Sequence, residues 1–182
     1  VEEGGTLHIE EGVKIIAVYD DIADYILVKQ GGKINAVGTP DKPIVMTSEK
    51  EEPGAWGGIH ICGRAHTNAE GGKGSSEIGG AVYGGNDDAD NSGTLQYIRL
   101  EYTGFAFDEE HEANGISFYS VGNGTIVDHC QAYKGSDDGF EFFGGSVNVS
   151  NLVAVSCSDD SFDWTEGWNG KGTNLVAYQE AE

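Results

Sequence analysis

A repeat of 22 residues is the feature of this sequence that most restricts its fold. Residues 128–142 superpose on residues 150–164 at this spacing, and a third copy begins at residues 174–178. The matched pairs include Ala132 with Ala154, Asp137 with Asp159, Asp138 with Asp160, and Phe140 with Phe162. A fixed period in this range is typical of solenoids, in which each repeat buries its apolar face against its neighbours. The chain is therefore predicted to consist of stacked, similar coils.

Weaker repeats extend the pattern toward the N-terminus. Residues 93–102 resemble residues 124–133, and residues 4–9 resemble residues 31–36 at a spacing of 27. Short runs of alternating apolar residues, bounded by Gly, Asn, Asp and Ser, indicate strands in each unit. These runs contain Leu7/Ile9, Ile26/Val28, Ile44/Met46, Ile98/Leu100 and Leu152/Ala154. No segment of ten or more residues carries an apolar period of 3.6, so no long helix is expected.

Short strands inside a 22-residue repeat predict an all-β fold, a right-handed parallel β-helix, with residues 1–182 forming a single domain. A β-sandwich would explain the alternation but not the superposition of the repeats. Two segments, residues 64–80 and 84–93, are expected to project from the coils as loops. The side chains expected to point into the core are Leu7, Ile9, Ile98, Leu100, Cys130, Ala132, Leu152 and Ala154.

The ends of the chain lead to two further expectations. The sequence starts at Val1 and stops within a coil, which favours a fragment or a short version of a longer protein. A β-helix presents unpaired backbone groups at both ends, and neither end of this sequence contains an obvious capping helix. End-to-end association into a homo-oligomer or fibre is one explanation of these open ends, and truncation from a longer protein is the alternative.

The charge excludes several partners. The 182 residues carry 31 acidic and 10 basic side chains, a net charge of −21. Nucleic acid and anionic membrane surfaces would repel such a chain. No apolar run approaches 18 residues, so membrane insertion is not expected either. The 38% of hydrophobic residues argue against a disordered chain.

The repeat brings two acidic motifs into register. Equivalent residues of adjacent coils lie about 4.8 Å apart, and two bare carboxylates at that distance repel by roughly 3–4 kcal/mol at an effective dielectric constant near 20. Hard oxygen ligands of this kind suit Ca²⁺, so we predict a calcium site; the alternatives are a solvated acidic face and a catalytic site. The predicted ligands are Asp137, Asp138 and Glu141 of one coil and Asp159, Asp160 and Asp163 of the next.

A second acidic segment offers oxygen donors within a single loop. Four such donors, Asp87, Asp88, Asp90 and Asn91, resemble a calcium-binding loop, although the full EF-hand pattern is missing. A turn built from Asp and Asn side chains explains the same residues equally well. A third acidic group, residues 108–112, could add ligands and contains His111, the histidine best placed for a metal.

No complete catalytic set is found. Many parallel β-helices act on polysaccharides, but a lyase needs a Lys or Arg that abstracts a proton, and only Lys134 lies within the acidic repeats. A glycosidase needs two carboxyl groups at a defined separation, which paired Asp residues could supply. A carbohydrate platform could be formed by Trp56, Trp164 and Trp168 together with Phe140, Phe142 and Phe143, although such residues more often fill coil interiors.

Several stretches together resemble the secreted right-handed parallel β-helix proteins of Bacteroidota-type bacteria, which have a pectate-lyase-like architecture without its catalytic motifs. The resemblance covers nearly the whole chain and implies secretion or surface display. The matching stretches include Gly5–Gly12, Gly38–Ser48, Trp56–Ile59, Tyr83–Gly93, Asp137–Gly145 and Asp159–Asp163.

These observations favour a non-catalytic extracellular structural or adhesive module that is stabilised by Ca²⁺. Its expected partner is a glycan or another surface polymer. The alternative is a polysaccharide-active enzyme, either a lyase or a glycoside hydrolase, or a carbohydrate-binding module.

Overall fold

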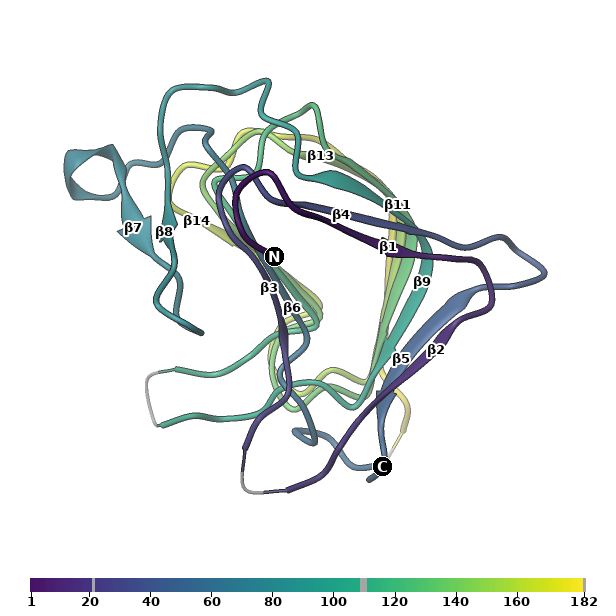
Figure 1. The fold of residues 1–182 in the computed structure, drawn as a ribbon. Helices are drawn as coiled ribbons and strands as arrows, with labels where there is room; N and C mark the ends of the chain where they lie inside the picture. The colour runs from purple at the N-terminus through teal and green to yellow at the C-terminus, as the bar shows by residue number, and fades with distance from the viewer. Residues whose placement is uncertain (21, 109–110, 182) are drawn as a thin grey trace.

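Parallel strands wind around a common axis in this protein, so that each coil pairs with the coil before and after it (Figure 1). The computed structural model describes residues 1–20, 22–108 and 111–181. The architecture is the predicted right-handed parallel β-helix. No helix in these ranges is long and apolar enough to cross a membrane.

The described chain contains short strands and one 3₁₀ turn. In chain order they are β1 (Thr6–Ile9), β2 (Lys14–Ala17), β3 (Ile26–Val28), β4 (Lys33–Val37), β5 (Ile44–Ser48), β6 (Ile59–Cys62), η1 (Glu70–Gly72), β7 (Gly74–Ser75), β8 (Val82–Tyr83), β9 (Gly93–Glu101), β10 (Ile116–Tyr119), β11 (Ile126–Tyr133), β12 (Phe140–Phe143), β13 (Asn148–Val155), β14 (Phe162–Thr165) and β15 (Gly172–Tyr178).

Two parallel sheets form the walls of the solenoid. One sheet has the order β1-β4-β9-β11-β13-β15, with β5 pairing with both β2 and β9. The other has the order β14-β12-β10-β6-β3 and is called sheet B below. Only β7 and β8 pair in antiparallel fashion among the described strands, and they stand outside the solenoid (Figure 1).

The sequence repeats correspond to strand register. Ala132 lies beside Ala154, and Phe140 lies beside Phe162, as the 22-residue spacing requires. The spacing of 27 is also confirmed, because Thr6 pairs with Lys33. The residues predicted to point inward are buried, except that Leu7 is only partly buried while packing against the same core.

One repeat alignment was wrong by one residue. Matching residues 93–102 with 124–133 would pair Thr94 with Thr125, whereas the structure pairs Thr94 with Ile126. The physical reason is the alternation of faces along a strand: a slip of one residue would place Ile98 beside the outward-facing His129 instead of the buried Cys130.

The long strands bend at residues with a left-handed backbone. In β9, β11, β13 and β15 these residues are Tyr97, His129, Asn151 and Asn174, with φ between 51° and 55°. They lie above one another: the rings of Tyr97 and His129 stack at 4.6 Å, and Asn174 Nδ2 donates to Asn151 Oδ1 at 3.0 Å. Asn and His tolerate this conformation better than most residues, which explains their use at a repeated corner.

The core lies between the sheets, and aromatic rings stack along the axis within it. Phe142 stacks on Phe118 at 5.0 Å and on Trp168 at 4.6 Å. Most of the aromatic residues that could have formed a carbohydrate platform therefore fill the interior. Cys62, Cys130 and Cys157 are buried and free.

Two segments were predicted to project from the coils as loops, and only the first of them does. Residues 64–80 project from the coils as expected. With residues 81–83 they form a segment, here called the arm, that carries η1, β7 and β8 (Figure 1). The predicted loop of residues 84–93 instead lies against the coils, because the carbonyl of Asp88 accepts hydrogen bonds from Asn123 N and Ser146 Oγ. Ala81 and Tyr83 of the arm cover Tyr119 and Phe143 on the outer face of sheet B.

Candidate functional site

An acidic pit lies on the outer side of sheet B and has a volume of about 220 Å³. All of its lining residues are acidic, and no Lys or Arg is among them. They are Glu77, Glu112, Asp137, Asp138, Glu141, Asp159 and Asp163. We call these residues the acid pit.

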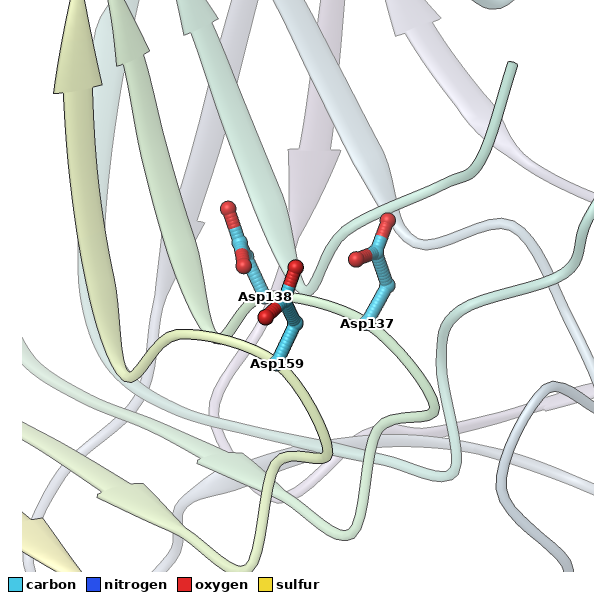
Figure 2. A group of neighbouring side chains, drawn as sticks. All are labelled: Asp137, Asp138 and Asp159. Atoms are coloured by element: carbon cyan, nitrogen blue, oxygen red, sulfur yellow. The ribbon is translucent and has the colours of Figure 1, made fainter. Parts of the chain in front are cut away.

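The coils position five of the seven carboxylates. Asp137 and Asp138 lie at the corner before β12, and Asp159 lies at the equivalent corner one coil later. The three side chains are therefore neighbours on adjacent turns of the solenoid (Figure 2). Glu141 in β12 lies beside Asp163 in β14 through the strand register. The 22-residue repeat thus places these side chains together, as predicted.

Inserted segments supply the other two carboxylates. Glu77 comes from the arm, between β7 and β8, and accepts a hydrogen bond from Tyr119 Oη at 3.3 Å. Glu112 comes from the segment between β9 and β10, whose acidic group was noted in the sequence. Residues 109 and 110 of that group lie outside the described residues. Glu77 has no sequence signal that could have identified it, since it is an isolated acid outside any repeat.

Asp160 is the predicted ligand that does not reach the acid pit. Its backbone N donates to Asp138 Oδ1 at 2.8 Å, so its peptide group faces the pit while its own side chain does not line it. Asp138 is buried, with only 7% of its surface exposed. The corner therefore orients Asp138 inward and Asp160 outward.

Glu141 is held by a cluster of buried polar side chains, Asn114 and Ser117. Asn114 Nδ2 donates to Glu141 Oε2 at 2.5 Å and to Ser117 Oγ at 3.1 Å. Asn114 is only 1% exposed, and its Oδ1 has no hydrogen-bond partner among the described residues. Gly58 permits this arrangement: its φ is +64°, and a Cβ there would lie 2.1 Å from the Asn114 carbonyl oxygen.

Burial raises the pKa values of the carboxyl groups in the acid pit. It is the largest cause of the rise for Asp137, to about 6, for Asp138, to about 7, and for Glu141, to about 9. Neighbouring carboxylates raise these pKa values further, including Glu112 beside Asp137 and Glu77 beside Glu141. At neutral pH the pit therefore holds protons that a divalent cation would displace.

The carboxylate oxygens converge in two groups of three. One group is Asp137, Asp138 and Asp159, and the other is Asp138, Glu141 and Asp163; within each, the ligand atoms all lie within 4.8 Å of one another. Such oxygen-only groups can hold a hard cation.

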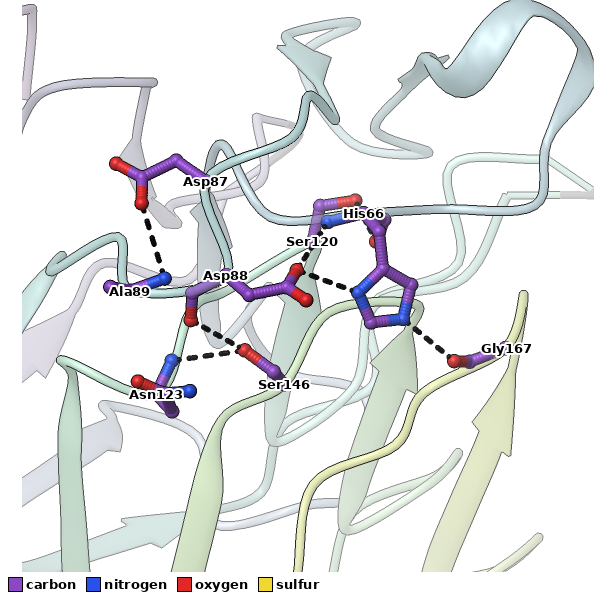
Figure 3. Close-up of polar contacts among 8 residues, drawn as sticks. All are labelled: His66, Asp87, Asp88, Ala89, Ser120, Asn123, Ser146 and Gly167. Atoms are coloured by element: carbon purple, nitrogen blue, oxygen red, sulfur yellow. Dashed lines mark hydrogen bonds and ion pairs between the residues drawn. The ribbon is translucent and has the colours of Figure 1, made fainter.

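The four predicted ligands near residue 90 are not among the converging groups of the described chain. Each uses a side-chain oxygen in a hydrogen bond: those of Asp87, Asp90 and Asn91 are local, as in the turn that was the alternative interpretation, whereas Asp88 bonds to the distant His66. Asp87 accepts from Ala89 N and Asp88 accepts from His66 N (Figure 3). Asp90 accepts from Ser92 Oγ, and Asn91 accepts from Gly93 N.

His66 joins three segments that are distant in sequence, a role that the sequence did not reveal. Its Nδ1 lies 2.7 Å from Asp88 Oδ1, and its Nε2 lies 2.9 Å from the Gly167 carbonyl oxygen (Figure 3). Because both partners are acceptors, both ring nitrogens must carry hydrogen, which is the protonated form. The hydrogen bond to Asp88 accordingly raises the pKa of His66.

We expect this contact to make stability depend on pH. A histidine with a raised pKa in the folded state stabilises fully below its unfolded pKa, near 6.5, and loses that contribution as pH rises through the folded value. His66→Gln should lower the free energy of unfolding by about 0.5–1 kcal/mol at pH 5.5 and by less at pH 8.5, because solvent screens this partly exposed ion pair. Urea denaturation of both proteins at the two pH values measures this difference.

His8→Gln is the matched control, because His8 is an exposed residue of β1. It should change stability equally little at both pH values. A loss in His66→Gln that is the same at pH 5.5 and 8.5 would show that the imidazole is neutral in the folded protein.

Comparison with known proteins identifies one family. A family model described as "Pectate-lyase like beta helix domain" matches residues 1–182. No curated protein and no solved structure gives a significant match. The family match spans both sheets, the arm and the acid pit.

Proposed function

The chain belongs to the pectate-lyase-like β-helix domain family, and from this premise we propose that it is a non-catalytic extracellular structural or adhesive module whose acid pit binds Ca²⁺. The observation that carries the proposal is the convergence of seven carboxylates on one pit without a basic residue in its lining. Such an arrangement is electrostatically unfavourable unless protons or cations compensate it.

The donor chemistry favours calcium over transition metals. The lining contains carboxylate oxygens and neither histidine nor cysteine. Ca²⁺ takes six to eight oxygen ligands at about 2.3–2.6 Å in flexible geometry, whereas Zn²⁺ and similar ions prefer nitrogen or sulfur. Extracellular modules bind Ca²⁺ with dissociation constants of about 10⁻⁴–10⁻³ M, a range that fits the proposed location.

The same lining argues against a lyase that acts on acidic polysaccharides. Such a reaction needs a base that removes a proton, together with positive charge that neutralises the uronate carboxylate. The lining of the pit has no Lys or Arg that could act as this base. An adhesive or structural role requires no such base.

One observation supports a second candidate, a glycoside hydrolase or carbohydrate-binding module. Burial raises the pKa of Glu141 to about 9, so its carboxyl group keeps a proton at neutral pH, and it lies beside the second carboxyl group, Asp163. This combination is what general acid catalysis of glycoside cleavage needs. The partner in either case is a glycan or a surface polymer.

A turnover assay separates the two candidates. The protein is incubated in millimolar CaCl₂ with polyuronates and with neutral glycans, and unsaturated products and new reducing ends are measured. We expect neither product to exceed the buffer control, while retention on immobilised polymer is compared in Ca²⁺ and in chelator. Turnover that disappears in Asp138→Asn and persists in Asp160→Asn would contradict the proposal and establish an enzyme.

A further inference from the structure

The C-terminal end of the solenoid is an open strand edge. Among the described strands, β15 pairs only with β13, and β14 pairs only with β12. Every residue of β15 is exposed, whereas β13, one coil earlier, is mostly buried or partly buried. The backbone N–H and C=O groups on the outer side of such a strand can pair with a strand of another chain.

This end also exposes side chains that occupy core positions in the earlier coils. Leu175 lies beside Leu152 in the strand register, and Leu152 is fully buried, yet Leu175 is 38% exposed. Trp164 lies beside the buried Phe142 and is itself exposed. Val176, at the rim of the same end, is exposed as well. The end is therefore an apolar surface of the kind that a partner buries.

The distribution of charge fits a second copy of the same strand. Edge strands of soluble proteins usually carry charged residues that prevent pairing, but β15 carries none, although 23% of the chain is charged. Its nearest charged neighbours, Lys171 before it and Glu180 after it, are exposed and opposite in sign. Two copies of β15 in antiparallel arrangement would place each Lys171 near the Glu180 of the other copy.

The shape of the last coil permits such an arrangement. β15 bends at Asn174, where φ is 55°, so its two halves form two sides of the coil, and β14 lies on the remaining side (Figure 1). A two-fold axis through this corner exchanges the two halves of β15 and places β14 on its own copy. The last coil, residues 156–181, offers 26 residues, within the roughly 20–30 residues per side of a standard interface.

The N-terminal end is a poorer partner for this surface. Val1 lies against the outer edge of β3, where its ammonium group donates to Leu27 O and its carbonyl accepts from Lys29 N. The inward side chains of the first coil are covered, since Ile9 and Val28 are both buried. This edge of sheet B is already paired in part, which favours the contact of two C-terminal ends over head-to-tail stacking.

We propose that the chain forms a two-fold symmetric dimer through its C-terminal ends, with β15 pairing antiparallel with its copy. The end-to-end association suggested by the sequence then closes at two copies, because both use the same surface. Each copy carries a net charge of −21, so the dimer is weak, with a dissociation constant of about 10 µM or higher. At lower concentrations the chain is a monomer with Trp164 exposed. The dimer does not depend on calcium binding.

Sedimentation equilibrium of the full chain over a range of micromolar concentrations tests the proposal. We expect the mass to rise from monomer to dimer and no further, and NaCl to strengthen association because it screens the net charge. Val176→Lys should weaken association by about tenfold or more, since it brings two like charges together near the two-fold axis. Val153→Lys is the matched control: Val153 lies beside Val176 in the same outward row, one coil inside the edge, and its variant should still dimerise.

Ile16→Lys tests the other end, because Ile16 is an exposed residue of β2, a strand that pairs only with β5. This variant should dimerise normally. Masses beyond the dimer that disappear in Ile16→Lys would establish head-to-tail stacking and overturn the two-fold arrangement. A dimer that persists in Val176→Lys would place the interface elsewhere, and a monomer at every concentration and salt would overturn the proposal and leave this end to another kind of partner.

A second measurement uses no edge variant and so does not depend on the folding of Val176→Lys. Dimerisation covers Trp164, so tryptophan emission of the wild type should move to shorter wavelength as concentration rises. Trp164→Phe should lack this shift. Emission that is independent of concentration while the mass doubles would contradict an interface at the C-terminal end. Circular dichroism verifies that each variant is folded.

Discussion

Millimolar Ca²⁺ is expected to raise the thermal midpoint of the protein far more than NaCl of equal ionic strength. Only the folded chain brings the carboxylates of the acid pit within 4.8 Å of one another, so the ion binds the native state and not the unfolded state. One site at a free Ca²⁺ concentration a hundredfold above its dissociation constant stabilises by about 2.7 kcal/mol. For a domain of this size that corresponds to a rise of roughly 5–10 °C, measurable by scanning calorimetry.

The stabilisation by Ca²⁺ should increase with pH. The raised pKa values mean that Asp137, Asp138 and Glu141 keep protons in the folded protein to about pH 6, 7 and 9. Without metal, the stability that these protons provide is lost as pH rises through those values. Ca²⁺ must displace the same protons, so its contribution to stability is smaller at pH 5.5 than at pH 8.

Two variants make this expectation specific. Asp138→Asn should remove the calcium increment and, because it removes a buried negative charge, leave the protein in chelator no less stable. Asp160→Asn should retain the increment. If Ca²⁺ and matched NaCl shift the midpoint equally in the wild type, the acid pit is a solvated acidic face and the calcium assignment fails.

Phe142→Ala is expected to be the most destabilising single side-chain truncation in the stacked core. Phe142 is 1% exposed, and its ring lies between those of Phe118 and Trp168. Removing a buried Phe side chain leaves a cavity and lowers the free energy of unfolding by about 3–5 kcal/mol. Urea denaturation monitored by circular dichroism measures the loss.

Trp164→Ala is the control from the same row of the solenoid. Trp164 pairs with Phe142 in the strand register, but 62% of its surface is exposed, because β14 is the last strand of sheet B. Truncation there should lower stability by about 1 kcal/mol or less. An equal loss in both variants would mean that this end of the solenoid is covered in solution.

The repeat by itself determined the solenoid and most of its predicted site. Because parallel coils pair with a constant offset, residues 22 apart must be neighbours, so the meeting of Asp137 with Asp159 and of Glu141 with Asp163 follows from the spacing. The alternation of inward and outward side chains also determines the correct register of β9 and β11, which the alignment of residues 93–102 with 124–133 missed. Only the pairing of Ile98 with Cys130 keeps both side chains inside the core.

The tertiary structure alone decided what the inserted segments do. Glu77 reaches the acid pit, and His66 bonds to Gly167, across 101 positions of sequence, because the arm packs on sheet B and on the last coil. No repeat relates these residues, so no offset predicts their partners. Asp160 and the acids near residue 90 lie apart from the converging carboxylates for a related reason: composition shows which oxygens are present, whereas corner geometry and hydrogen bonds decide where each one points.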